Sequence, residues 1–397
     1  MKKYLYSFLC GTITGAVVFF FKLIARKAEE LSRLLFSLAK GSLLFALLLF
    51  VVVGILIFLS SFLQKKIPEC KGGGISKSKN IIENSSELRS FRTLIGTFAG
   101  SLISFFSSVG VGTEGPSVLM GTSVGSLFSK KAEERKCIMI SGASAGFAAA
   151  TGAPLSALFF SSEEIHKRFE LPLIFVSSFA VLSSTLTNLL LCRIFSLNSK
   201  LFLVEIYNSF CWKQISGLFF LSVTVAICVF VFEAFLKAIK KINFSVFKFP
   251  LIFVLSALFA LFFDSAVYSG HKLTESVFEG EFTLRLLFVV LILRILLLVL
   301  VKKTHITGGV FLPCLAIGAL IGAISANLLM PIGFEESLFI NLTLLGMCAF
   351  IGSVMKAPLM ACVFYIELTG DLQSALYVFI VVFLTYALTE ATENLLA

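Results

Sequence analysis

The chain has 397 residues, of which 58% are hydrophobic and only 14% are charged. A water-soluble domain carries about 25% charged residues, so this composition excludes an ordinary soluble enzyme or binding module. The net charge of +10 lies mostly in loops such as 65–79 and 130–136. That pattern is typical of cytoplasmic loops and lipid headgroup contact, and it argues against nucleic-acid binding.

The chain begins with a segment, 1–27, that predicts a first membrane helix, because its apolar part extends to Leu23 and lacks an Ala-x-Ala-like cleavage site. Further apolar runs lie at 43–63, 217–235 and 286–301 with its flanks, and about 20 such residues cross a bilayer. None of these runs alternates apolar and polar residues as a membrane β-strand does. We therefore predict an all-α polytopic membrane protein without a soluble domain.

Other apolar segments are short and are broken by glycine and proline. The segments 139–150 and 154–162 are each about half as long as a membrane span. Non-helical backbone at membrane depth persists only where protein or a water-filled cavity covers it. Broken and re-entrant helices therefore favour a transporter or channel over a simple receptor or anchor.

The chain contains two pairs of matching segments in the same order. The segments 112–125 and 308–322 both read Pro-x4-Gly-x3-Gly, and 141–164 matches 345–367. In the second pair a glycine precedes Ala-Pro-Leu by 11 residues, and the proline precedes a glutamate by 9. We predict one transport domain, 1–397, built from two repeats of about 1–205 and 206–397, as in many transporters. The alternative is chance similarity among helices rich in small residues.

Three glycine-rich stretches lie where helices are expected to begin. They are GGGIS at 72–76, the stretch 110–115 before Pro116, and the stretch 307–311 before Pro313. The first N–H groups of a helix lack internal partners and carry a partial positive charge. Glycine lets an ion approach this backbone closely, so such an end binds anions without a buried Lys or Arg. A cation channel would need carbonyl or acidic rings instead.

Glu114 is the only acidic or basic side chain between Arg92 and Lys130. A carboxylate at an anion-binding helix end competes with the anion when it is ionised, and it can leave when it is protonated. A carboxylate inside a membrane is costly unless it has a partner or a function. We expect Glu114 to act as gate and proton carrier, and the alternative is a buried helix-capping carboxylate without a transport role.

Four motifs together resemble the CLC family of chloride channels and chloride/proton antiporters. They are GGGIS (72–76), GTEGP (112–116), GAPLSALFFSSEE (152–164) and GGVFLP (308–313), and the resemblance extends in order over nearly the whole chain. It implies a homodimer with a separate anion pore in each subunit and two inverted-topology repeats per subunit. It also implies the exchange of chloride, or a similar anion, for protons across a membrane.

The resemblance assigns roles to individual residues. Glu114 becomes the gate and external proton-transfer group, and Glu164 the internal proton-transfer group. From the residues alone, Glu164 reads more simply as a surface charge at the end of a span. The anion-binding backbone falls on Gly72, Gly73, Gly74, Ile75, Ser76, Gly112, Thr113, Gly115, Pro116, Gly309, Val310, Phe311, Leu312 and Pro313.

Three departures from the family pattern affect this expectation. The serine of the family's GSGIP is Gly73 here, and the arginine before the gating glutamate is Thr113. The sequence ends at Ala397, short of the family's last helix with its anion-contacting tyrosine. A hydrogen bond to a charged partner contributes about 1.5–3 kcal/mol, so we expect weaker central anion binding or looser coupling.

Several alternatives follow from the same residues. A passive chloride channel would use Glu114 as gate and leave Glu164 idle. A fluoride/proton antiporter fits less well, because 308–313 keeps Phe311 and has no acid. An intramembrane enzyme lacks support, since the three histidines are scattered and no Cys-x-x-Cys pair occurs. We expect no cofactor and no metal, membrane lipid as a partner, and a bacterial inner-membrane location.

Two buried-looking charges have plainer expected roles. Arg294 lies inside the apolar run 286–301, where we expect it to make an interhelical hydrogen bond or to extend toward the membrane surface. Glu367, near the end of the second repeat, is expected close to an aqueous face.

Overall fold

A computed structural model describes residues 1–84, 88–199, 201–202, 215–242, 248–264, 267–332 and 338–396. Within these residues the regular elements are helices, apart from one isolated antiparallel bridge, which confirms the predicted all-α class. The helices are α1 (Lys2–Gly41), α2 (Leu43–Lys66), η1 (Pro68–Cys70), α3 (Ile75–Glu83), α4 (Ser90–Phe106), α5 (Glu114–Gly125), α6 (Ala132–Thr151), α7 (Pro154–Phe160), η2 (Ser161–His166), α8 (Leu171–Ile194), α9 (Ile215–Lys240), α10 (Lys248–Phe262), α11 (His271–Phe278), α12 (Leu284–Thr304), α13 (Phe311–Leu329), η5 (Met330–Ile332), α14 (Leu338–Val354), α15 (Pro358–Thr369) and α16 (Ala375–Leu396).

Seven of the described helices are long and apolar enough to cross a membrane: α1, α2, α8, α9, α12, α13 and α16. The first of them is longer than its sequence predicted, because α1 has 40 residues. The polar stretch that follows Leu23 is rich in good helix formers and contains no proline, so nothing ends the helix before Gly41. At about 1.5 Å per residue, α1 is roughly twice as long as the hydrocarbon core is thick.

We predicted that 139–150 is a segment about half as long as a membrane span. That prediction is wrong, because these residues belong to a longer helix, α6. Helix α6 has 20 residues, because its first turns contain the polar residues of Ala132–Cys137 before the apolar part begins. Helix α7 is short, with 7 residues, and it continues directly into the π-helical turn η2. This region of the chain therefore combines one full-length helix with one broken one.

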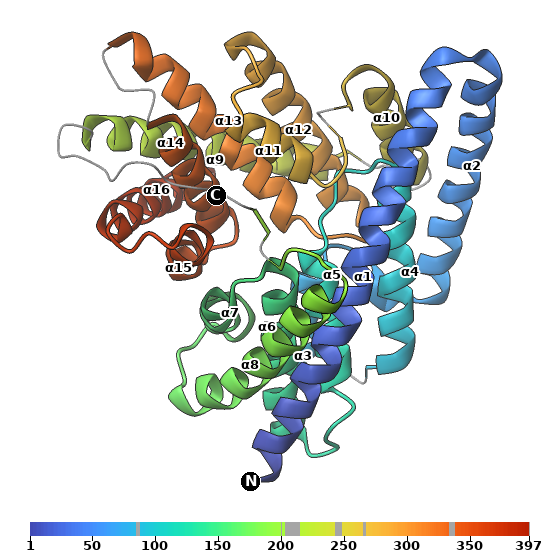
Figure 1. Ribbon diagram of the computed structural model, residues 1–397, viewed down its shortest axis with the longest axis vertical. Coiled ribbons are helices and arrows are strands. Elements are labelled where there is room, and N and C mark those ends of the chain that lie inside the picture. The colour runs from blue at the N-terminus through green and yellow to red at the C-terminus, as the bar shows by residue number, and fades with distance from the viewer. Residues whose placement is uncertain are drawn as a thin grey trace.

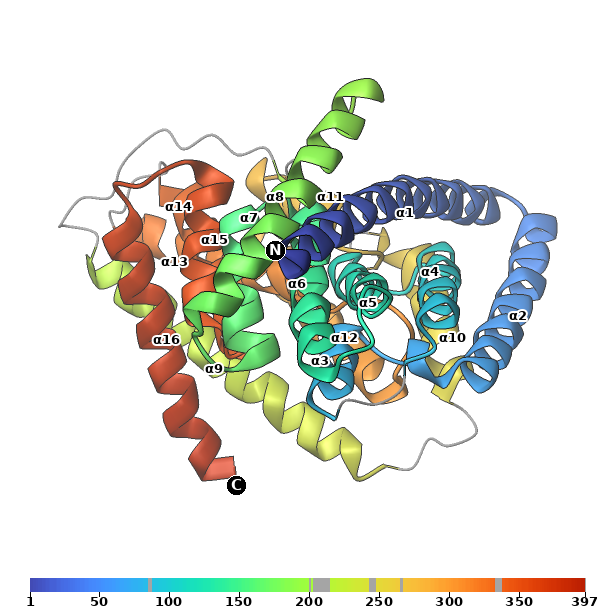
Figure 2. The same ribbon diagram turned by 90° about the horizontal axis from the view of Figure 1, so that it is seen from below.

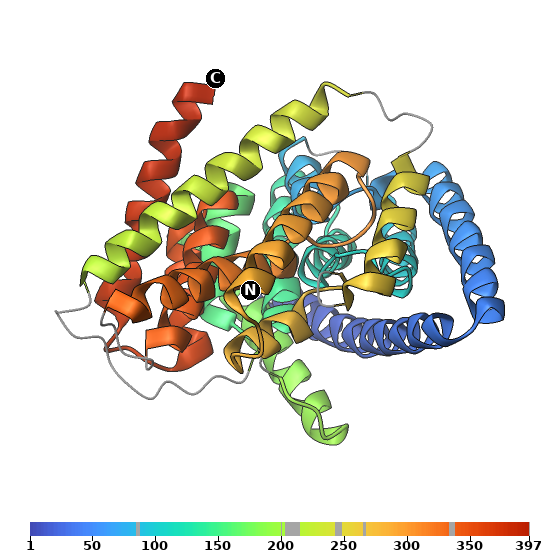
Figure 3. The ribbon, with the colours of Figure 1, turned by 90° about the horizontal axis from the view of Figure 1, so that it is seen from above.

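The two halves of the chain lie beside each other. In Figure 1 most helices of the first half, coloured blue to green, gather at the bottom and right, and most of the second half lies at the upper left. The views from below and above agree that α1 and α2 form one end of the molecule, and that α9 and α16 form the opposite end (Figures 2 and 3). The interior between these ends contains α5, α6, α13 and α14.

The matching sequence segments make matching contacts. Helices α5 and α6 pack so closely that a Cβ atom added at Gly142 would lie 2.2 Å from the carbonyl oxygen of Gly121. Helices α13 and α14 pack in the same way, since a Cβ atom at Gly346 would lie 2.5 Å from the carbonyl oxygen of Gly318. Gly121 and Gly318, from the two Pro-x4-Gly-x3-Gly stretches, thus have the same role: each lets two helices approach closely. The repeat boundaries themselves stay a prediction.

Candidate functional site

Three helices begin at one place in the interior. Helix α3 begins after Gly74, α5 begins at Glu114, and α13 begins at Phe311. Pro116 in α5 and Pro313 in α13 each lie at the third helical position, where a missing N–H costs no helical hydrogen bond. The glycine-rich stretches before these helices are the ones that the sequence singled out.

Backbone hydrogen bonds join the three stretches. Gly112 and Gly309 exchange two of them, with N···O distances of 2.7 and 2.8 Å, and they form an isolated antiparallel bridge. The amide of Gly72 donates to the carbonyl oxygen of His305 at 2.9 Å, and the amide of Gly308 donates to Gly72 at 3.4 Å. These backbone bonds therefore hold the stretches before α3, α5 and α13 together at one place.

Only glycine fits at the closest contacts. A Cβ atom at Gly115 would lie 1.8 Å from the carbonyl oxygen of Gly73, and one at Gly74 would lie 2.1 Å from that of Gly115. Gly74 also has a φ of +83°, which an L side chain rarely adopts. Gly73 is different, because a Cβ atom there would meet its nearest neighbour, the carbonyl oxygen of Gly308, at 3.6 Å. This position therefore has room for a side chain.

Side chains from other helices fix the stretch before α13. The Ser104 hydroxyl donates to the carbonyl oxygen of Thr307 at 2.6 Å, and the Thr307 hydroxyl donates to that of Cys70 at 2.9 Å. The Gln64 amide donates to the carbonyl oxygen of His305 at 3.1 Å. These residues were missed by sequence reasoning, because their partners are distant in the chain.

Glu114 lies where the starts of α5 and α13 meet, and its side chain is fully buried. Its Oε1 accepts a hydrogen bond from the Thr113 hydroxyl at 3.1 Å. Its Oε2 lies against Gly112, 2.4 Å from where a Cβ atom of that glycine would be, and close to the backbone of Leu312. The carboxylate therefore lies beside the start of α13, and its Oε2 atom has no hydrogen-bond partner among the described residues.

Aromatic rings cover the inner side of these helix starts. The Phe311 ring makes edge contacts with Phe147 and Phe364, with centroid distances of 5.1 and 5.7 Å, and Phe147 stacks on Phe160 at 4.3 Å. The four rings come from α13, α6, α15 and α7. They join the start of α13 to the part of the molecule that contains η2.

Glu164 lies in η2, away from the three helix starts, and is half-buried. Its Oε1 is 3.7 Å from Nζ of Lys79 in α3. Lys79 is four residues after Ile75, the first residue of α3, so about 6 Å of helix axis separates the two. Glu164 is thus held near the same short helix whose start contributes to the site around Glu114.

The neighbouring Glu163 has a structural partner that the sequence did not reveal. Its carboxylate accepts hydrogen bonds from the amides of Leu359 and Met360, in the first turn of α15, at 3.0 and 2.7 Å. In the other repeat, Glu367 accepts hydrogen bonds from the amides of Leu155 and Ser156 in α7, both at 2.7 Å. Each matched glutamate therefore caps the matched helix of the other half.

Arg294 is buried, and it makes neither the interhelical hydrogen bond nor the extension toward the membrane surface that the sequence led us to expect: its partners lie in the loop before α11. Its guanidinium donates to the carbonyl oxygens of Tyr268 and Val267 at 2.9 and 3.0 Å. It thereby fixes the backbone just before α11 and does not extend toward a membrane surface.

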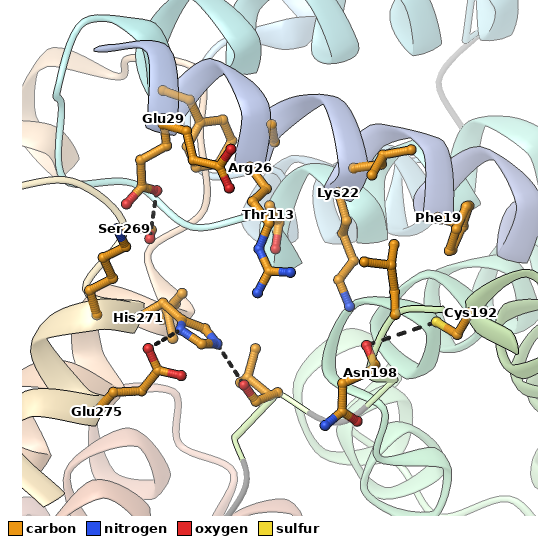
Figure 4. A pocket seen from close by; sticks show the side chains of 18 of the residues that line it. Phe19, Lys22, Arg26, Glu29, Thr113, Cys192, Asn198, Ser269, His271 and Glu275 are labelled. Carbon is orange, nitrogen blue, oxygen red and sulfur yellow. Dashed lines mark hydrogen bonds and ion pairs between the residues drawn. The ribbon is translucent and has the colours of Figure 1, made fainter. Parts of the chain in front are cut away.

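A cavity of about 200 Å³ opens beside Glu114. Its inner wall includes Thr113 and Leu312, the residues on either side of the Glu114 carboxylate. The rest of its wall comes from α1, from Phe105 in α4, from α8 and the residues that follow it, and from α11 together with Ser269; Figure 4 shows most of these side chains. The cavity gives small solutes an approach to the start of α5.

The chain matches the family model described as "Voltage gated chloride channel" over residues 56–390. It is 28% identical over 387 residues to an H(+)/Cl(-) exchange transporter ClcA of Salmonella paratyphi A, covering 91% of this chain and 80% of that protein. It is 26% identical over 385 residues to the ClcA of Yersinia pseudotuberculosis, covering 91% and 79%.

Solved structures have the same fold. A slow cyanobacterial Cl-/H+ antiporter matches with a TM-score of 0.88 and 22% identity, covering 99% of this chain and 95% of that one. A CLC-type fluoride/proton antiporter matches with a TM-score of 0.81 and 18% identity, covering 98% and 95%. A eukaryotic CLC transporter matches with a TM-score of 0.79 and 20% identity, covering 98% and 72%.

Proposed function

This chain belongs to the voltage gated chloride channel family, and we propose that it exchanges chloride, or a similar small anion, for protons across a membrane. The protein is an integral, multi-pass membrane protein of this family. Two relatives that match 91% of the chain are named as H(+)/Cl(-) exchange transporters. Those relatives are transporters, so we propose no enzymatic activity.

In this proposal the anion binds at the convergent starts of α3, α5 and α13. The backbone of Gly72–Ser76, Gly112–Pro116 and Gly309–Pro313 lies at or next to these starts. The amides of Gly72, Gly112 and Gly309 already donate to carbonyl oxygens. Val310 and Phe311 offer N–H groups at the start of α13. Unpaired amides and helix dipoles bind a small anion without a cationic side chain. The Ser76 side chain is exposed, so only its backbone would contribute.

The position of Glu114 is the observation that carries the proposal. An ionised carboxylate beside the start of α13 takes the place that an anion would take. When it is protonated it loses its charge, so the anion can displace it, and the proton can travel with the side chain. Binding of anion and ionised carboxylate thus exclude each other, which is the condition for exchange.

Glu164 supplies the second carboxylate that a proton needs on the other side of the site. It is half-buried near Lys79, in the η2 turn that directly follows Phe160 of α7. A passive channel needs only Glu114 as gate and would leave Glu164 without a role. The exchange of protons uses both, and it is therefore preferred.

Chloride is preferred over fluoride as the transported anion. One structural neighbour is a fluoride/proton antiporter, so the fold alone admits either ion. Phe311 is buried between Phe147 and Phe364 at the start of α13, and no acid lies in 308–313. An apolar ring beside the amides suits a large, weakly hydrated halide better than a small, strongly hydrated one.

The proposal also includes the oligomeric state, the membrane location and the two repeats. The family resemblance supports a homodimer with one pathway in each subunit, and the relatives from Yersinia and Salmonella support a bacterial inner-membrane location. The matched Gly121–Gly142 and Gly318–Gly346 contacts support two repeats of common origin.

The test uses purified protein in liposomes under a chloride gradient, with the voltage clamped by a potassium ionophore and the external pH recorded. We expect protons to move against their own gradient, in the direction opposite to chloride. Chloride movement without any proton movement would contradict exchange and favour the passive channel.

A further inference from the structure

The cavity beside Glu114 has an unusual balance of charged side chains. Its cations are Lys22, Arg26 and Arg33 from α1 and Lys272 from α11, together with His271 when protonated, and its acids are Glu29, Glu30 and Glu275. A wall with both signs of charge could favour either kind of ion. The partners of each group decide between them.

All three acids of the cavity are already engaged. Glu29 pairs with Arg33 at 3.1 Å and accepts from the Ser269 hydroxyl at 2.9 Å. Glu30 pairs with Lys27 at 2.8 Å, and Glu275 lies 3.2 Å from Nδ1 of His271. The hydrogen bond with His271 lowers the pKa of the Glu275 carboxyl. Glu275 therefore stays ionised and remains the partner of His271. Arg33 is further neutralised by Asp264 at 2.7 Å.

Three cations of the cavity have no such partner. Lys22, Arg26 and Lys272 make no ion pair within 4.0 Å of an acid in the part of the chain that the structure describes, although Arg26 and Lys272 lie near enough to Glu30 and Glu275 to favour the ionised form of both carboxyls. Lys22 and Arg26 are four residues apart on α1, and like charges at this spacing repel each other. Figure 4 shows both side chains extending from α1 into the cavity.

Lys22 is held in place at the inner end of this group. Its ammonium donates to the carbonyl oxygens of Ala149 and Ala150, at 3.3 and 2.7 Å, at the C-terminal end of α6. A lysine has three N–H donors, so one remains for a ligand in the cavity. Its charge also attracts the Glu114 carboxylate. Thr113 itself is uncharged, so the positive charge beside Glu114 comes from α1.

We propose that this cavity is an outer anion-binding site, in which Lys22, Arg26 and Lys272 hold one small inorganic anion, such as chloride, bromide or nitrate. The site rests on the proposed function, because the anion held there waits for the place that Glu114 occupies. An anion between Lys22 and Arg26 removes their mutual repulsion. A volume of about 200 Å³ accommodates the ion with several waters, each of about 30 Å³.

The first test locates the anion directly and does not depend on transport. Anomalous diffraction would be recorded from crystals of the full chain and of Arg26→Gln, each grown in bromide. We expect a bromide peak in the cavity between α1 and α11 of the wild type that weakens or disappears in the variant. Bromide at the starts of α3, α5 and α13 but none in the cavity would overturn the proposal.

The second test asks whether charge at position 26 matters for anion capture. The variant Arg26→Cys, made in a Cys192→Ala background because the free Cys192 thiol lines the same cavity, should raise the half-saturating external chloride concentration about threefold or more, at an unchanged maximum rate. A membrane-impermeant cationic thiosulfonate added outside should largely reverse this change, and an anionic one should not. The matched control is Lys40→Cys, an exposed position on the same helix outside the cavity, which should respond to neither reagent.

The outcomes separate this site from the proposed function. An unchanged half-saturating concentration, whichever charge is attached at position 26, would overturn the outer site and leave exchange intact. Bromide in the cavity of a protein that moves no chloride would support the site and contradict exchange.

Discussion

At the scale of single residues, Glu114 could be identified from the sequence because no other ionisable side chain lies between Arg92 and Lys130. Its surroundings could not be predicted. The Oε2 atom lies against Gly112 and beside Leu312, which is almost 200 residues further along the chain. Helix-start amides are groups that bind a small anion, and the buried Oε2 atom beside them has no hydrogen-bond partner among the described residues.

Lys22 is a residue to which the sequence analysis assigned no role. It was visible in the sequence as a charge inside an apolar run, and a charge within a membrane span indicates a function by default. Its partners, the carbonyl oxygens of Ala149 and Ala150, come from another helix. Only the packing of α1 against α6 reveals that Lys22 lies next to the start of α5.

Gly73 leads to a prediction about anion affinity. The variant Gly73→Ser should bind chloride about tenfold more tightly, because a side chain fits there without a clash and a hydroxyl can donate a hydrogen bond to an anion. Calorimetric titration of the purified protein with chloride measures this change. A folded variant with unchanged affinity would show that the missing hydroxyl does not limit central binding.

The neighbouring glycine provides the matched control. Gly74→Ser adds the same hydroxyl one residue away, but its Cβ atom would lie 2.1 Å from the carbonyl oxygen of Gly115. The stretches before α3 and α5 would have to separate. We expect this variant to fold poorly or to lose anion binding.

At the scale of helices, the sequence aligned Glu163 with Glu367 through their spacing from Pro154 and Pro358, but it did not indicate what they bind. We expected Glu367 near an aqueous face, and the structure places its carboxylate on the first amides of α7. The exchange of caps between α7 and α15 depends on how the two halves pack. No local sequence pattern contains that information.

These caps should contribute measurably to stability. Each of Glu163→Ala and Glu367→Ala removes an acceptor from two helix-start amides, so each should lower the free energy of unfolding by about 1–2 kcal/mol. Thermal unfolding of the detergent-solubilised protein should show a lower midpoint for both. The control Glu279→Ala, an exposed acid at the end of α11, should change little. A midpoint as high as that of the control would contradict the capping role.

At the scale of the whole molecule, composition and hydrophobic segments were enough to predict a polytopic helical protein. The Pro-x4-Gly-x3-Gly stretches were visible as a match between two segments, but the close helix contacts of Gly142 and Gly346 were not predicted from them. The length of α1 and the cavity beside Glu114 were not predicted. Both depend on how polar turns extend beyond the apolar runs and meet residues from distant segments.

The central claim is that chloride and protons exchange along a route that uses Glu114 and Glu164. The most direct test measures chloride and proton fluxes of Glu164→Gln in liposomes, beside the wild type and the control Glu133→Gln, an exposed acid in the first turn of α6. We expect Glu164→Gln to keep chloride flux and to lose proton movement, because the amide cannot carry a proton, while the control retains both. Proton movement that persists in Glu164→Gln at the wild-type rate would contradict the account.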